Sequence, residues 1–145
     1  MTRTQRLRPV QNLAEENERR LAQSLGVLQR RLADAEAKLA ELERYRADYE
    51  RQFTQQVGQG MSVVGLRDYQ AFLARLTEAI RQQQALVQRA RIERDQESKR
   101  WQEAATRAKA VDHVIEQWRI EERRNLDRRE QRDSDERAQR KVHRS

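Results

Sequence analysis

The sequence has no cysteine, one proline and four glycines among its 145 residues. Without cysteine the chain can form neither a disulfide nor a thiolate zinc site, and it does not require an oxidising compartment. So little proline and glycine argues against a fold with many tight turns. No apolar run reaches the ~18 residues of a membrane span, and the N-terminus lacks the apolar segment of a signal peptide. We therefore expect long helices in a soluble or peripheral protein, and a cytoplasmic location agrees with these features.

Hydrophobic residues make up only 36% of the chain, but their spacing is regular. Steps of seven residues define a d position that is apolar throughout: Leu7, Ala14, Leu21, Leu28, Ala35, Leu42 and Tyr49. The companion a position holds Leu25, Leu32, Leu39 and Phe53, with polar residues at Gln11, Glu18 and Arg46. A second series alternates steps of four and three: Tyr69, Leu73, Leu76, Ile80, Val87, Ala90, Trp101, Ala104, Ala108, Val111, Ile115 and Trp118. It is broken by Gln83, Arg94 and Glu97. Such heptads predict two coiled-coil helices.

Three of the four glycines, Gly58, Gly60 and Gly65, lie between the two series. A phosphate-binding loop needs Lys and Ser or Thr after its last glycine, but Leu66 and Arg67 follow here. The glycines are therefore interpreted as a turn, in which Gly58 adopts the left-handed conformation that ends helices and Asp68 caps the next helix.

The predicted fold is all-α, a two-helix antiparallel coiled-coil hairpin in which the second helix is longer than the first. Pro9 is tolerated in a first helical turn and suggests where the first helix starts. The register that pairs Phe53 with Tyr69 also places Leu21 opposite Trp101 and Leu7 opposite Ile115. The expected segments are a frayed basic N-terminus (1–8), the first helix (9–57), a glycine-rich turn (58–66), the paired second helix (67–118) and a charged overhang, partly helical or disordered (119–145).

Nothing in the sequence indicates catalysis. The only histidines, His113 and His143, lie far apart in the sequence, and the charged residues fall on solvated helix faces. We expect no enzyme activity, no cofactor and no metal.

The charge of +7 is concentrated at the termini. Residues 1–10 contribute +3, and residues 119–145 contribute another +3 from ten basic and seven acidic residues. An acidic protein partner, a nucleic acid and a merely solubilising tail are all open interpretations. The interleaved acids and the absence of aromatic residues in the tail disfavour nucleic acid.

The aromatic residues gather near the turn instead, where five of the seven lie: Tyr45, Tyr49, Phe53, Tyr69 and Phe72. On the g flank of the seam this region reads Lys38, Tyr45, Gln52, Phe72, Ala79 and Leu86, whereas the e flank reads Glu36, Glu43, Glu50, Gln70, Thr77 and Gln84. Tyr45 and Phe72 either shield the seam or form a partner-binding patch.

Several stretches together resemble the flagellar type III export protein FliJ family over essentially the whole chain. They are LRPVQNLAEENERR, YRADYERQF before the Gly-x-Gly turn, DYQAFLARLTEAI, and the tail EERRNLDRREQRDSDERAQRK. The resemblance implies a non-enzymatic cytoplasmic stalk protein, similar in form to the γ subunit of rotary ATPases and peripheral to the inner membrane. It also implies that the terminal halves of both helices enter the pore of the hexameric export ATPase, that the turn-proximal face contacts the export gate, and that export chaperones bind.

The resemblance implies specific gate-binding residues, namely Leu42, Tyr45, Tyr49, Phe72, Leu76 and Ala79, with Gln83 next in line. Contacts with the ATPase ring are assigned to arginines near the termini, namely Arg3, Arg6, Arg8, Arg123, Arg124, Arg128 and Arg129. The alternatives are a stalk protein of a virulence type III secretion system, a generic coiled-coil scaffold and a nucleic-acid-binding hairpin.

Overall fold

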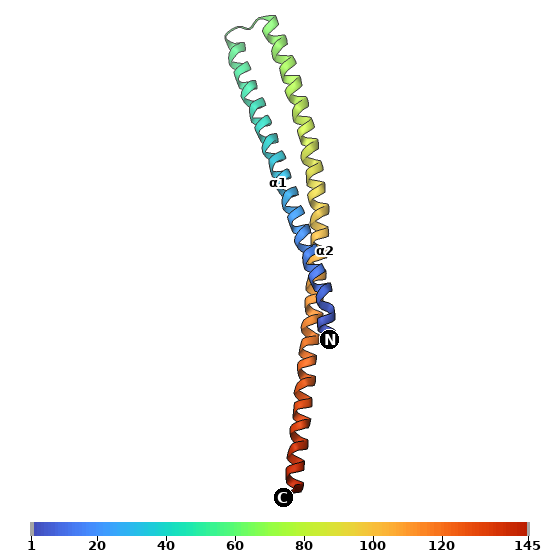
Figure 1. Cartoon of the computed structure of the whole chain (residues 1–145). Helices are drawn as coiled ribbons and strands as arrows, with labels where there is room; N and C mark the ends of the chain where they lie inside the picture. Colours follow the sequence, from blue (N-terminus) through green and yellow to red (C-terminus); the bar gives the residue numbers. More distant parts are fainter. Residues whose placement is uncertain (1, 145) are drawn as a thin grey trace. The chain divides into compact units, whose positions relative to one another are not determined.

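The computed structural model describes residues 2–144, which form two helices (Figure 1). Helix α1 spans Arg3–Gly58 and helix α2 spans Val63–Arg144. The two helices pack against each other in opposite directions, α2 is the longer, and residues 2–144 contain no strand. The all-α two-helix prediction is confirmed.

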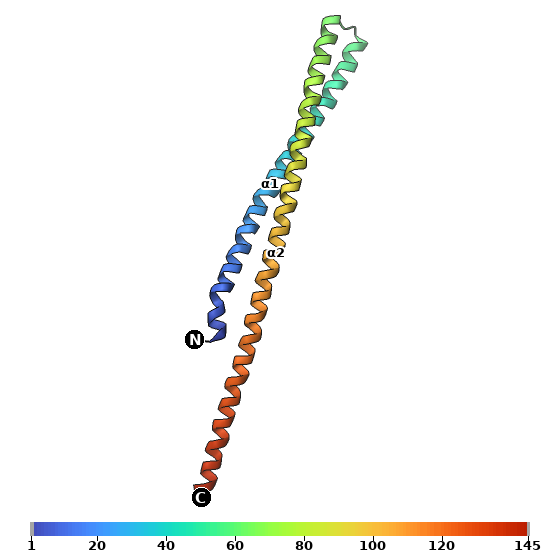
Figure 2. The same cartoon turned by 90° about the vertical axis from the view of Figure 1, so that its right-hand side faces the viewer.

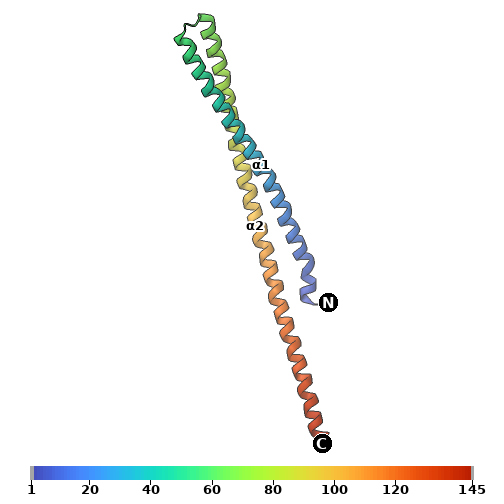
Figure 3. The ribbon, with the colours of Figure 1, turned by 90° about the vertical axis from the view of Figure 1, so that its left-hand side faces the viewer.

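The chain divides into two compact units, each built from a piece of both helices. The turn unit is Leu21–Trp101, and the terminal unit consists of Met1–Arg20 with Gln102–Ser145. In the turn unit, α1 and α2 leave the turn side by side, as the views from both sides agree (Figures 2 and 3).

The core of each unit is a single seam of heptad positions. Its buried members are Leu32, Leu76, Ile80, Gln83, Val87 and Ala90 in the turn unit, and Ala104, Ala108 and Ile115 in the terminal unit. All of them occupy a or d positions of the predicted heptads, and Leu32 packs with Val87 and Ala90 from the other helix. The stacked rings of Phe53 and Tyr69 confirm the predicted register.

Helix α1 begins at Arg3, earlier than the start predicted at residue 9. The cause is a reciprocal cap, in which the Gln5 amide donates to Thr2 Oγ1 at 3.2 Å and the Thr2 amide donates to Gln5 Oε1 at 3.1 Å. This capping box satisfies two N–H groups that would otherwise lack partners, and it nucleates the helix before the proline. Pro9 therefore lies inside α1, where its missing N–H removes the helical hydrogen bond that the Gln5 carbonyl would otherwise accept.

The turn is shorter than predicted, since α2 begins at Val63 and not at residue 67. Ser62 is the cap, and not Asp68: its hydroxyl accepts a hydrogen bond from the Gly65 amide at 3.1 Å. A β-carbon on Gly65 would lie 3.2 Å from Met61 Cγ and 3.3 Å from this hydroxyl, so glycine keeps the cap uncrowded.

Gly60 provides the left-handed residue that was predicted at Gly58. Gly60 has φ 90°, whereas Gly58 is the last residue of α1. The Gln59 and Gly60 amides bond to the carbonyls of Gln56 and Val57 three residues back, so α1 tightens before it ends. The glycine-rich segment is thus a helix reversal, as the sequence indicated.

In the terminal unit, α2 continues as helix to Arg144, and Figure 3 shows it running past the start of α1. Residues 123–144 are all exposed, but the pairing of the helices reaches Glu122, beyond the boundary predicted at residue 118.

Candidate protein-interaction surfaces

Five aromatic side chains of the turn unit form one continuous contact chain across the two helices. Phe53 stacks on Tyr69 with ring centroids 3.6 Å apart, and Tyr69 stacks on Tyr49 at 5.2 Å. Tyr49 contacts Phe72 at 4.5 Å, and Phe72 meets Tyr45 edge to face at 6.0 Å. Such pairs each add about 0.5–1.5 kcal/mol beyond the area they bury. We call these five residues the aromatic ladder.

The ladder changes from core to surface along its length. Tyr49, Phe53, Tyr69 and Phe72 are partly buried, whereas Tyr45 is 52% exposed. Tyr45 therefore contacts Phe72 edge to face and still leaves about half of its side chain accessible to solvent.

The other residues predicted to bind the export gate lie at two depths beside the aromatic ladder. Leu42 and Ala79 are partly buried, and Leu76 is buried in the seam. The structure thus brings Tyr45, Phe72 and Ala79 to the g flank, whereas Leu76 is core and contacts solvent very little.

Packing within the ladder also changes the acidity of Tyr69. Burial raises the pKa of the Tyr69 phenol above its ordinary value, and the nearby Glu50 carboxylate and Tyr49 raise it further. The neutral phenol is therefore the form that the folded turn unit favours.

Polar residues interrupt the seam of the turn unit and bind the opposite helix. The buried Gln83 amide donates to the Ala35 carbonyl at 3.0 Å, and the Ser24 hydroxyl donates to Glu97 Oε2 at 3.0 Å. The second carboxylate oxygen of Glu97 is buried and accepts no hydrogen bond. Gln83 thus supports the interpretation that polar seam residues fix the register, whereas the second Glu97 oxygen has an ion pair with the Arg100 guanidinium at 3.8 Å in place of a hydrogen bond.

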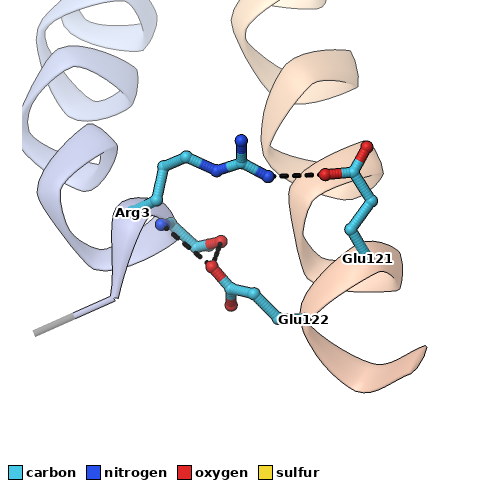
Figure 4. Close-up of polar contacts among 4 residues, drawn as sticks. Arg3, Glu121 and Glu122 are labelled. Carbon is cyan, nitrogen blue, oxygen red and sulfur yellow. Dashed lines mark hydrogen bonds and ion pairs between the residues drawn. The ribbon is translucent and has the colours of Figure 1, made fainter. Parts of the chain in front are cut away.

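A cluster of polar contacts closes the seam of the terminal unit (Figure 4). The Arg3 guanidinium lies 2.6 Å from the Glu121 carboxylate and 4.1 Å above the ring of Trp118. The Thr4 hydroxyl donates to Glu122 at 2.8 Å, and its amide donates to the same carboxylate at 3.4 Å. We call Arg3, Thr4, Trp118, Glu121 and Glu122 the terminal clasp.

The sequence reasoning missed most of the clasp, although the register contained the signal. The register pairs Leu7 with Ile115. One helical turn farther along, the first residues of α1 therefore lie opposite the residues that follow Trp118 in α2. Gln11 supports the same register, because its amide donates to the Asp112 carboxylate at 2.7 Å. The acids at 121 and 122 were counted only as tail charges, so their role in pairing the helices was overlooked.

The arginines predicted to bind the ATPase ring divide into two groups. Arg3 is held by the terminal clasp and is half exposed. The others are exposed, two on α1 and four on the single-helix part of α2: Arg6, Arg8, Arg123, Arg124, Arg128 and Arg129.

The terminal unit also carries an apolar hollow beside its seam. The hollow measures about 510 Å³ and lies among Val10, Leu13, Ala14 and Val111, with Arg20 and Arg107 also lining it. Val10 is 50% and Leu13 67% exposed, so large apolar side chains are also exposed beside the seam of this unit.

Among residues 2–144, no cluster of metal-ligating side chains is present, and no helix is long and apolar enough to cross a membrane.

No curated protein matches the chain, and no solved structure does. A family model described as "Flagellar FliJ protein" matches residues 3–145. The match covers both helices, the turn between them and the exposed end of α2. The chain therefore belongs to the FliJ family, the non-enzymatic stalk proteins of flagellar type III protein export.

Proposed function

We propose that the protein couples the hexameric export ATPase to the export gate by binding each with a different unit. The terminal unit contacts the ATPase ring, the g flank of the turn unit contacts the cytoplasmic part of the gate, and export chaperones bind the same protein. In this proposal the protein acts in the cytoplasm, peripherally at the inner membrane. The observation that supports it most is the half-exposed ring of Tyr45 at the end of the aromatic ladder.

The gate contact is supported by the chemistry of the ladder. Phe72, which itself packs on Tyr49, holds the Tyr45 ring from one side, so a partner that covers the other side orders few additional rotatable bonds. Rigid aromatic residues of this kind dominate the binding energy of protein interfaces. We assign the direct contacts to Tyr45, Phe72 and Ala79, with Leu42 and Tyr49 supporting them and Leu76 acting from the seam.

The ATPase contact is supported by the exposed arginines of the terminal unit. All seven predicted arginines are exposed, and a ring lined by carboxylates would attract them over long distances. Arg3 is assigned to the terminal clasp first, because its charge is already paired with Glu121.

The gate assignment is tested with the variants Tyr45→Ala and Phe72→Ala. Each is expected to weaken binding of the gate's cytoplasmic domain by at least about tenfold, because each removes a ring of the exposed patch. Arg44→Ala is the matched control, since Arg44 is exposed and next to Tyr45 but occupies the f position of the heptad, on the side of α1 away from the seam. Circular dichroism checks that helicity is retained. Wild-type affinity in both folded variants would refute the assignment.

The ATPase assignment is tested by ending the chain after Glu122. This truncation removes the four predicted arginines of α2 with the rest of its exposed end but keeps the terminal clasp, so the pairing of the helices stays intact. Stimulation of the ATPase is expected to fall while the melting temperature hardly changes. Undiminished stimulation would contradict the assignment to the exposed end of α2.

A further inference from the structure

A second surface of the turn unit has the shape and charge of a docking site. It is a hollow of about 310 Å³ on the g flank, farther from the turn than the aromatic ladder. Ala35, Gln83 and Ala90 line it at the seam, and the small alanine side chains leave it open. Leu86 is 49% exposed beside it and gives it an apolar wall. We call this the alanine hollow.

Two arginines line the alanine hollow, one on each helix. Arg31 comes from α1 and Arg89 from α2, and both are exposed. Neither forms an ion pair or a side-chain hydrogen bond within the part of the chain that the structure describes. Glu93 also lines the hollow, four residues beyond Arg89, and it lies outside ion-pair distance of Arg31.

The opposite flank at the same level is closed. There Arg91 of α2 reaches across to Glu36 of α1, with nitrogen and oxygen 3.5 Å apart, so a charged pair spans the seam. On the g flank no such pair forms between residues 21 and 101, and the apolar surface of Leu86 stays open between unpaired cations. The e flank is therefore covered by an ion pair between the two helices, whereas the apolar surface of the g flank is uncovered.

We propose that the alanine hollow binds an amphipathic helix of a protein partner, one whose apolar stripe is bordered by acidic residues. A large apolar side chain of this helix enters the hollow over Ala35 and Ala90 and packs against Leu86. Its carboxylates pair with Arg31 and Arg89, and Glu93 repels them from the far end, which sets the direction of the helix. A partner helix that binds along a two-helix seam in this way makes its contacts through apolar residues three and four positions apart.

This inference does not depend on the gate or the ATPase. Only Gln83, named next after the gate-binding residues, also lines the hollow, and the variants that test the hollow leave Gln83 unchanged, so either proposal can fail alone.

The experiment uses the full chain and two synthetic amphipathic helical peptides with the same leucine stripe. One peptide carries glutamates beside the stripe, and the other carries lysines at the same places. Titration calorimetry measures affinity, and NMR follows the amide shifts of Leu86 and Ala90. The glutamate peptide is expected to bind and to shift these amides, and the lysine peptide to bind at least about tenfold more weakly.

Three variants locate the binding. The double change Arg31→Gln and Arg89→Gln is expected to weaken the glutamate peptide about tenfold or more, and Leu86→Ala is expected to weaken both peptides. Arg44→Gln, on the face away from the hollow, should leave binding unchanged. Glutamine and alanine both tolerate a helix, so these variants remain folded.

Several results would overturn the proposal. They are equal affinity for the two peptides, absence of binding, shifts elsewhere than at the alanine hollow, or an affinity that the double arginine variant leaves unchanged. Tighter binding of a DNA duplex through the same arginines would overturn it too, because a nucleic acid would then be the better occupant.

Discussion

The turn unit and the terminal unit follow the same seven-residue pattern but fill it differently. The turn unit places aromatic rings and large aliphatic side chains in its seam, whereas the buried seam of the terminal unit contains Ala104, Ala108 and Ile115. The terminal unit is closed by an ion pair and hydrogen bonds, and it bears the exposed charged end of α2. The same heptad repeat can therefore form one unit stabilised mainly by buried side chains and another that is closed at its end by polar contacts.

The largest effect is expected from truncating a core residue of the turn unit. Ile80 is only 3% exposed, and Ile80→Ala should cost about 2–4 kcal/mol of unfolding free energy because it leaves a cavity. Ile115→Ala is the matched change in the terminal unit, and it should cost less because Ile115 already borders a hollow of about 170 Å³. Urea denaturation of both variants measures the difference. A larger loss at Ile115 would break the comparison.

A smaller effect of opposite sign is expected at the polar seam position Glu97. The double change Ser24→Ala and Glu97→Leu removes a buried carboxylate oxygen that accepts no hydrogen bond, and it adds apolar surface to the seam. Replacing both partners of a buried polar contact is neutral or favourable, and the 3.8 Å ion pair of Glu97 with the exposed Arg100 contributes little, so we expect a gain of about 1 kcal/mol. Thermal denaturation measures it, with Glu97→Ala as the control for lost packing. A lower melting temperature in the double variant would contradict this account.

The terminal clasp should contribute less, and its contribution should depend on salt. Arg3→Ala removes an exposed ion pair and a contact with the Trp118 ring, which together are worth about 0.5 kcal/mol. Hydrogen exchange of the first turns of α1 is expected to accelerate, while exchange at Leu32 in the turn unit stays unchanged. Arg6→Ala serves as the control, because Arg6 is exposed and makes no ion pair among residues 2–144. Equal acceleration in both variants would show that the clasp adds nothing.

The smallest effect is expected from the ionisation of Tyr69. Because the pKa of its phenol is raised in the folded protein, the unfolded chain loses this proton first as the pH rises. The stabilisation that comes from the Tyr69 phenol should therefore be fully present below about pH 10 and be lost as the pH rises above it. Tyr69→Phe should reduce this alkaline loss, as melting temperatures across the alkaline range would show. An unchanged pH dependence in Tyr69→Phe would exclude Tyr69 as its source.

The heptad spacing was sufficient to predict the fold class, the register and the core. Every buried residue lies at an a or d position, because a two-helix seam offers no other place to bury a side chain. The pairing of Phe53 with Tyr69 was predicted for the same reason.

The helix ends were harder to predict, because they depend on single hydrogen bonds. Pro9 and Asp68 are common residue types at helix starts, but Thr2 with Gln5 and Ser62 with the Gly65 amide provide the actual caps. The pattern T-x-x-Q at residues 2–5 is a recognisable capping box, whereas a lone Ser62 has many equivalents in a polar turn.

Surface roles were the least predictable. The spacing placed Tyr45 and Phe72 on the g flank, but it could not show that Tyr45 would be half exposed while contacting Phe72. The alanine hollow was also missed, because its openness depends on which side chains make ion pairs and not on the hydrophobic pattern.

The exposed end of α2 has a consequence for proteolysis. Residues 123–144 carry many arginines on a helix without a partner helix, and trypsin cleaves only backbone that has locally unwound. The rate at which trypsin removes this segment thus measures how often the single helix opens, without any label on the chain. A partner that binds this segment would slow its cleavage, so the same digestion would detect the binding in a crude bacterial extract.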